Sequence, residues 1–397
     1  AYILICVINF NGKDGCLKCT VSGEYSHVSR TVVFPTLRCP LRNDQLFRQR
    51  AYGNHHNGQD TPLLRIPALD MIQDFVVADP LHLLELGIMK RLLTGWRDGS
   101  LGFTGKLSAY QIQCLSTATV NVSLPKEIHR RMRAIDCLSY WKGTEWRSFL
   151  NYVGVVVLKD ILDVTLYNHF LLLFTAVTIC SSDMYASMRP IAQALFEKFI
   201  EEFKIIYGEQ YITSNIHNLE HVVGDVNRFG SLNTISAYPF ESYLFQIKNL
   251  LRQGNFCLEQ VINRMQEKKV QQTNGSNQLF MPKLVKRKGF IECEVREGLF
   301  INNTFRNAWF LTKNLEIVKM IDIRMNANSN IIIYGCPVKK YTNFFEIPIK
   351  SSFLYIFLSD LCVNNSRPYT ISDILCKYVT VPYKNDKIVF LPLLHTL

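Results

Sequence analysis

The sequence predicts an α/β domain that is interrupted by a long helical stretch and followed by a small, mostly β domain. In residues 75–78 a short β-branched run ends at Asp79, and Pro80 then opens a segment whose apolar residues recur with helical spacing. Residues 106–215 show the helical period in most of their length. Residues 289–397 instead consist of short aromatic and β-branched runs between turn residues.

Asp79 lies between the end of the predicted strand and the start of the helix, and His82 follows about one helical turn later. Acidic side chains at the carboxyl end of a strand are where α/β sheets tend to hold ligands or metals. The alternative is that Asp79 only caps the helix. Asp70 and Asp74 precede the strand, where capping or surface roles are the expected ones.

The N-terminal segment combines a predicted strand at residues 2–8 with a cysteine pair, Cys16-x-x-Cys19. This spacing is typical of half a zinc site, since zinc accepts mixed Cys and His ligands. We expect His56 as the third ligand and leave Cys39 and His55 open as the fourth. Two core cysteines beside a polar loop are the alternative.

Residues 38–62 form a polar loop in which arginines alternate with aromatic residues. Such a pattern can follow a phosphate backbone and stack on bases, although a solvated loop is the commoner outcome. The residues are Arg38, Arg42, Phe47, Arg48, Arg50 and Tyr52.

The helical stretch is predicted from apolar stripes, which are clearest in residues 191–207. The other expected helices cover residues 109–118, 126–138, 146–161 and 166–179. Two tryptophans of this stretch, Trp141 and Trp146, could stack on a flipped base, although core packing is the usual role of such residues.

Three further residues stand out after the helical stretch. His217 and His221 are four residues apart, so they share one helix face, but the glutamate of the zinc-protease motif is missing. We expect hydrogen bonding or scaffold contacts there, with zinc as the less favoured option. Glu241 falls in the first turn of a helix, where a carboxylate is also favoured by the helix dipole.

Residues 266–288 contain a polar, low-complexity run flanked by lysines and arginines, which predicts a basic linker. Contacts to DNA phosphates are expected from Lys286, Arg287 and Lys288, and from Lys90 and Arg91 on the helix after Asp79. Beyond the linker, strands are expected at residues 309–311, 331–334, 344–349, 353–358 and 387–391.

Three blocks resemble the CACTA (En/Spm-like) group of cut-and-paste DNA transposases. They are Asn11-Gly-Lys-Asp-Gly-Cys16-Leu-Lys-Cys19, then Asp79-Pro-Leu-His82 with the apolar run after it, and finally His217-Asn-Leu-Glu-His221 with Ser236-Ala-Tyr-Pro-Phe-Glu241. They occur in the family's order and cover roughly residues 1–252.

This resemblance implies an RNase H-like core interrupted by an all-α insertion and followed by the mostly β domain. It implies that Asp79 and Glu241 are the second and third carboxylates that bind Mg²⁺ or Mn²⁺, with His82 beside them, and that the first Asp lies before Ala1. The expected segments are a first core part with the Cys/His segment (1–105), the insertion (106–215), the last core part (216–265), the linker (266–288) and the β-rich domain (289–397).

Composition narrows the functional class. The chain is 48% hydrophobic with a net charge of +11, which excludes a disordered protein and favours a polyanionic partner. The twelve scattered cysteines indicate a reducing compartment, and no membrane segment or signal peptide is expected. The chain also begins without methionine, which we interpret as N-terminal truncation.

The sequence therefore predicts a nuclear transposase, or a protein derived from one, that cleaves and transfers DNA strands at transposon ends. DNA and further copies of the chain are the expected partners. Mg²⁺ or Mn²⁺ are the expected cofactors, and Zn²⁺ is a further candidate. The alternatives are a host-adopted, catalytically inactive DNA-binding or regulatory protein and, more weakly, a nuclease acting on RNA or on RNA–DNA hybrids.

Overall fold

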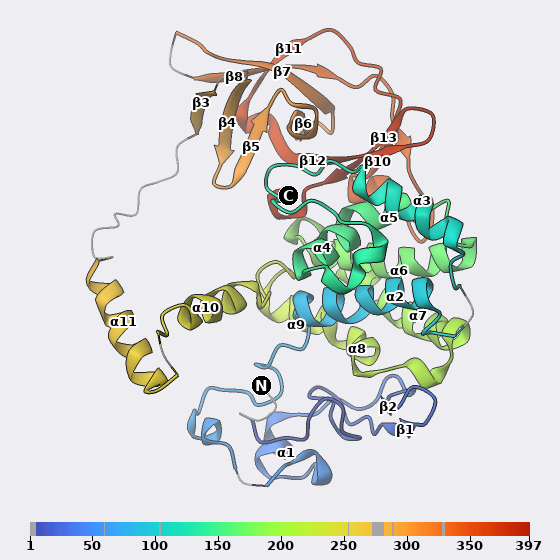
Figure 1. Cartoon of the computed structure of the whole chain (residues 1–397), viewed down its shortest axis with the longest axis vertical. Helices are drawn as coiled ribbons and strands as arrows, with labels where there is room; N and C mark the ends of the chain where they lie inside the picture. The colour runs from blue at the N-terminus through green and yellow to red at the C-terminus, as the bar shows by residue number, and fades with distance from the viewer. Residues whose placement is uncertain are drawn as a thin grey trace.

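The computed structural model describes residues 5–58, 60–102, 105–252, 254–271, 282–287, 290–327 and 330–397. A body of helices occupies the centre, the N-terminal segment lies against one end of it, and the strands of the C-terminal part lie at the other end (Figure 1). Two helices form an arm that extends from the side of the body (Figure 1).

The N-terminal segment contains little regular structure. A two-stranded antiparallel sheet is followed by one short helix; their bounds are β1 (Glu24–Ser26), β2 (Thr31–Val33) and α1 (Asp44–Arg48). The strand predicted at residues 2–8 falls partly outside the described residues, and Val7 makes a single bridge to His56.

The strand predicted at residues 75–78 is absent from the described structure, because the segment joins no sheet. The backbone amides of Val77 and Ala78 donate instead to one carboxylate oxygen of Asp225, at 2.7 and 3.0 Å. A side chain has therefore replaced the neighbouring strand as the hydrogen-bond partner. The helix predicted after Asp79 is present, with a π-helical first part, Pro80–Met89, that continues into α2 (Lys90–Asp98).

The helical body is built from α2 and from helices joined by short connections. They are α3 (Ala109–Val120), α4 (Gly143–Ser148), α5 (Gly154–Val157), α6 (Val164–Cys180), α7 (Arg189–Tyr207), α8 (Ser214–His217) and α9 (Val222–Phe229). The helix predicted at residues 126–138 is wrong: only a short 3₁₀ segment, Ile135–Tyr140, forms there. α6 is buried almost all round, because α7 and neighbouring elements cover it. No helix in the described part of the chain has both the length and the apolar character that crossing a bilayer requires.

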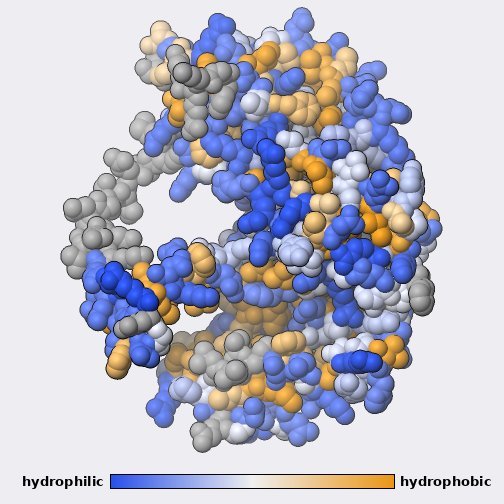
Figure 2. Space-filling view, in the orientation of Figure 1, coloured by the Kyte–Doolittle hydropathy of each residue, from blue (hydrophilic) through white to orange (hydrophobic). Residues whose placement is uncertain are grey.

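The arm consists of α10 (Tyr238–Lys248) and α11 (Cys257–Gln271). No residue of α10 is buried, and Figure 2 shows apolar side chains on the visible face of the arm. Large exposed residues of α10 and of the stretch that begins α11 include Phe240, Leu244, Phe245, Phe256 and Leu258. Glu241 lies at the base of this arm, where α10 leaves the body.

The C-terminal part consists of two antiparallel sheets. Three strands, β3 (Lys283–Arg287), β4 (Phe290–Arg296) and β5 (Leu299–Asn302), form one. The other has the order β11-β8-β7-β6-β12-β13-β10-β9. Its strands are β6 (Trp309–Thr312), β7 (Ile317–Met325), β8 (Ile331–Pro337), β9 (Thr342–Asn343), β10 (Phe357–Ser359), β11 (Arg367–Thr370), β12 (Ile374–Tyr383) and β13 (Lys387–Pro392).

The connection between β8 and β9 forces the larger sheet to curl. The two strands are six strand spacings apart in the sheet order, which is about 29 Å in a flat sheet. Only residues 338–341 join them, and a chain of that length spans at most about 18 Å. Consistently, Val338 pairs with Val363, just before β11, so the link is hydrogen-bonded to the β11 side of the sheet.

The strands predicted in this part are only partly correct. β6, β8 and β13 lie where strands are predicted, and β10 overlaps the end of the predicted 353–358 run. Residues 344–349 form no strand. Phe344 and Phe345 pack into the core of the helical body instead, and the Lys159 ammonium donates to the Phe344 carbonyl at 2.5 Å.

A buried ionic cluster joins the helical body to the sheets. The ammonium of Lys377, which is fully buried, donates to both carboxylate oxygens of Glu127 at 2.9 and 2.8 Å and to Asn307 Oδ1 at 2.8 Å. Next to it, Lys126 pairs with the buried Glu292 at 2.7 Å. Burial lowers the pKa of Lys377 to about 8, against the opposing effect of Glu127.

Before β3, the described residues contain no sheet other than β1–β2. An RNase H-like core therefore remains a prediction. The core of the helices is continuous with part of the larger sheet, because Val379, Val381, Val389 and Leu391 belong to the same apolar cluster as α6 and α7.

Replacing Lys377 with methionine, which keeps the length of the side chain, should destabilise the protein. The Glu127 carboxylate would remain buried without its counter-ion, at a cost of about 3–5 kcal/mol in the free energy of unfolding. Urea denaturation measures this loss. The control is Lys384→Met at the exposed Lys384–Asp160 pair, which should change the free energy by less than about 1 kcal/mol. Equal effects of the two substitutions would contradict the assigned role of the cluster.

Candidate metal centre and carboxylate site

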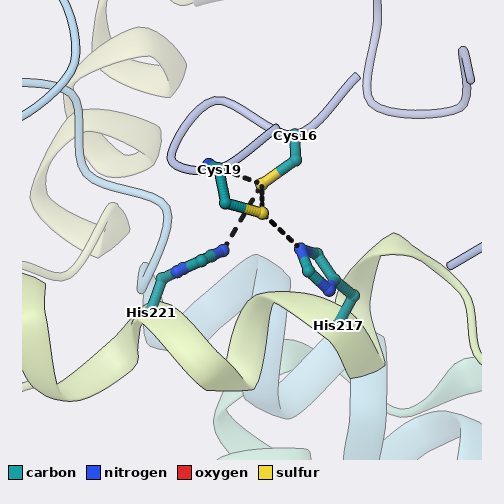
Figure 3. A group of neighbouring side chains, drawn as sticks. All are labelled: Cys16, Cys19, His217 and His221. Carbon is teal, nitrogen blue, oxygen red and sulfur yellow. Dashed lines mark hydrogen bonds between the residues drawn. The ribbon is translucent and has the colours of Figure 1, made fainter. Parts of the chain in front are cut away.

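Two cysteines and two histidines from distant parts of the chain converge on one point. Cys16, Cys19, His217 and His221 place their ligand atoms within 4.8 Å of one another, and all four are buried (Figure 3). The distance from Cys19 Sγ to His217 Nε2 is 3.3 Å, that from Cys16 Sγ to His221 Nε2 is 3.4 Å, and that between the sulfurs is 3.5 Å. Ligand atoms of tetrahedral zinc are about 3.3–3.8 Å apart. These three distances fall within that range, so the group could hold a metal ion.

Local structure explains how the four side chains are aimed. The Cys19 amide donates to Cys16 Sγ at 3.4 Å, which holds the two sulfurs on the same side of the turn. His217 ends α8 and His221 immediately precedes α9, so one helical turn separates them. Phe34 stacks on the His217 ring, with the two ring centres 5.7 Å apart.

The chemistry of this group favours a structural metal. Hydrogen bonding with Cys19, aided by the two histidines, holds the pKa of Cys16 well below its usual range despite its burial. Cys19 shares the proton, and its own pKa is raised. His217 Nδ1 lies 3.8 Å from a Glu220 carboxylate oxygen, the kind of outer contact that orients metal-binding histidines. Four protein ligands leave no open position for substrate.

The structure brings together two of the expected ligand residues and not the others. Cys16 and Cys19 belong to the group, but His56 does not, and neither Cys39 nor His55 completes it. The His56 ring packs against Phe47, with the ring centres 4.8 Å apart. His55 Nδ1 bonds to the Asp14 carbonyl at 2.7 Å. The histidine pair that was expected to be a scaffold supplies the remaining ligand positions.

The second site joins Asp79, His82 and Glu241, although 162 residues separate the two carboxylates in the sequence. His82 Nδ1 makes a short contact with Asp79, and His82 Nε2 lies 3.7 Å from a carboxylate oxygen of Glu241. His82 and Glu241 are both exposed, at 58% and 55% of their side-chain areas. A cavity of about 590 Å³ adjoins Asp79 and His82 and provides room for a substrate.

Asp79 is more heavily hydrogen-bonded than its neighbours. Its carboxylate accepts the amides of Leu81 and His82, which makes it the cap of the helix after Pro80. It also accepts the Ala237 amide at 2.8 Å, just before α10. Asp79 therefore fixes the start of both helices that carry the site, and the capping role considered from the sequence is present.

The buried carboxyl group of Glu85 holds the start of α10 close to this site. The Tyr238 hydroxyl donates to Glu85 through a short hydrogen bond, which ties the first turn of α10 to the helix after Asp79. Burial raises the pKa of Glu85 to about 7, and the hydrogen bond from Tyr238 opposes this effect. The sequence offers one signal for Glu85: it is an acidic residue in an otherwise apolar helical run.

The predicted DNA-contacting residues have different surroundings. Lys90 is exposed, whereas the Arg91 guanidinium lies over the Tyr211 ring, and burial lowers its pKa. Lys286 and Arg287 belong to β3, but their side chains lie outside the description, as does all of Lys288.

The remaining predicted side chains serve the fold. Arg38, Arg42, Arg48 and Arg50 of the 38–62 loop each bond to groups of the same chain. Trp141 and Trp146 are buried in the helical core, so neither can stack on a base. Asp70 closes a turn by accepting the amides of Ile72 and Gln73, and Asp74 pairs with Arg228.

Comparison with known proteins identifies one family match. Residues 274–393 match a domain of unknown function, DUF8592, which corresponds to the β-rich part of the chain. No curated protein and no solved structure matches the chain.

The four-residue group predicts which variants lose a bound metal. Purified protein loaded with Zn²⁺ should hold one ion per chain after dialysis, and His217→Ala should hold none, because three ligands bind zinc far more weakly than four. Elemental analysis by mass spectrometry measures the ratio. His56→Ala is the matched control and should retain the ion. Loss of zinc in the control but not in His217→Ala would restore the ligand set expected from the sequence.

The raised pKa of Glu85 predicts a pH-dependent loss of stability. The native state binds a proton more tightly than the unfolded state, so the stabilisation is complete below pH 4.5 and is lost as the pH rises through 7. In Glu85→Gln the side chain stays neutral at every pH. Between pH 5 and pH 8 the free energy of unfolding of this variant should therefore fall by about 3 kcal/mol less than that of the wild-type protein. Urea denaturation at both pH values tests this, with the exposed Glu24→Gln as control. An unchanged pH dependence in Glu85→Gln would refute the assignment.

Proposed function

We propose that this chain is part of a DNA transposase of the CACTA type, or of a protein derived from one, that cleaves and transfers DNA strands at transposon ends. The observation that carries the proposal is the approach of His82 to both Asp79 and Glu241, with Asp79 and His82 lining one cavity.

The two carboxylates supply the oxygen ligands that Mg²⁺ and Mn²⁺ prefer. Within the described residues, Asp79 and Glu241 do not form a compact metal site with a third ligand. The resemblance implies a further carboxylate, the family's first Asp, which has no counterpart among residues 1–397. A bound cation would polarise the phosphodiester and activate the attacking water or 3′-hydroxyl.

The residues of this chain would position the substrate. Asp79 holds His82 through its Nδ1 atom, so that Nε2 remains directed towards Glu241 and the exposed surface. From there the ring can donate a hydrogen bond to a phosphate oxygen when both of its nitrogens carry a proton, because Nδ1–H already faces the Asp79 carboxylate. The Cys/His group would hold the N-terminal segment, which contributes Asn9 and Phe10 to the wall of the same cavity, against the helices.

One observation favours a second candidate, a catalytically inactive DNA-binding protein that kept the scaffold. The Asp79 carboxylate already accepts hydrogen bonds from three backbone amides and contacts His82. A carboxylate engaged in this way is well suited to a structural role and must release partners before it binds a cation.

The test uses the natural full-length protein. Asp79→Asn keeps the helix cap but removes a metal-binding oxygen, so Mg²⁺-dependent cleavage of transposon-end DNA should fall below about one-thousandth of the wild-type rate. DNA affinity should remain within a factor of about two. Asp70→Asn, at a capping aspartate outside the site, is the control and should cleave normally.

Cleavage by Asp79→Asn at the wild-type rate would overturn the catalytic assignment. Absence of cleavage by the wild-type protein, together with normal DNA binding, would support the inactive candidate.

A further inference from the structure

The β-rich part contains a basic groove at the place where its curled sheet closes. We define the seam as residues 338–341 together with the groove walls that face them. A cavity of about 830 Å³ lies on one side of the seam and a smaller one of about 110 Å³ on the other, and Lys340, Tyr341 and Thr342 line both.

The charge of the seam is positive. Lys339, Lys340 and Lys387 line the cavities and are exposed, and within the described residues no carboxylate forms an ion pair with any of them. Arg367 is neutralised by Glu316. Asp360 is the other acidic residue on these walls, so three unpaired lysines face one carboxylate.

Neutral hydrogen-bonding groups accompany the lysines. Thr342, Asn364 and Asn365 line the same groove. The backbone around them is fixed, because the Lys339 amide donates to the Cys362 carbonyl at 2.7 Å and the Asn364 amide donates to the Pro337 carbonyl at 2.8 Å. The Tyr341 ring is held by an edge-on contact with Phe357 and by its hydroxyl bond to the Leu315 carbonyl.

We propose that the seam binds the phosphate backbone of DNA, which gives the β-rich part a role separate from the carboxylate site. Lysine ammonium groups act as point charges towards phosphates, and Asn and Thr side chains are frequent neutral phosphate contacts. Because no arginine at the seam is free to contact a base edge in two places, the binding is independent of sequence. The choice of DNA as the polyanion rests on the proposed function.

The experiment measures binding of the full-length protein to a fluorescein-labelled DNA duplex of arbitrary sequence over a range of salt concentrations. In the double variant Lys339→Gln/Lys340→Gln, the slope of log affinity against log salt should fall by about two. At about 0.1 M salt this corresponds to a loss of affinity of roughly 60-fold. The matched control is Lys313→Gln/Lys350→Gln, which removes two exposed lysines of the same part outside the seam. It should keep the wild-type slope.

Three outcomes would overturn the proposal. One is wild-type affinity in the seam variant, and another is an equal loss in the control. The third is binding of a polyglutamate peptide in preference to the duplex, which would indicate an acidic protein partner. These results are independent of cleavage, so failure of Asp79→Asn to abolish cleavage would refute the catalytic assignment and leave the seam unaffected. Failure of the seam variant to lose affinity would refute the seam proposal and leave the catalytic assignment unaffected.

Discussion

The buried carboxylate of Asp225 determines how the chain is assembled around the candidate sites. One of its oxygens accepts the amides of Val77 and Ala78, and the other pairs with Lys18 at 2.8 Å. Lys18 stands between the two cysteines of the Cys/His group in the sequence. A single side chain on α9 therefore fixes the approach to Asp79 and the cysteine turn at once. Because both partners are largely buried, neither can lose the other without leaving a charge in an apolar environment.

The two candidate sites depend on different kinds of support. The Cys/His group is enclosed, and its members come from elements that pack against the helical body. Glu241 belongs to a helix without buried residues, so the contacts at the start of α10 determine its position. Those contacts are the Ala237 amide on Asp79 and the Tyr238 hydroxyl on Glu85. Asp79 and His82 thus belong to the packed helical body. Glu241 is held in place only through the start of α10.

Local pattern was sufficient to predict parts of this structure. Apolar stripes located α6 and α7, and the proline after Asp79 located the following helix. The strand predicted at residues 75–78 does not form, because the amides of Val77 and Ala78 bond to the Asp225 side chain, 147 or more residues away, which no local pattern reveals. The ligand set failed for a related reason. His56 is closer to the cysteines in the sequence, but the fold brings His217 and His221 to them instead. The i, i+4 spacing of these two histidines was the one signal in the sequence for their role.

The strand order of the larger sheet has a consequence for protein synthesis. β13 is the last strand in the sequence, yet it lies between β12 and β10 and so links the two halves of the sheet. On the ribosome, β9 and β10 can pair with each other, but they remain separate from β6, β7 and β8 until residues 387–392 have emerged. The edges of both halves stay unpaired during that interval, and unpaired edges promote association between chains. A premature stop codon that removes residues 387–397, and with them β13, would therefore divide the sheet rather than shorten it.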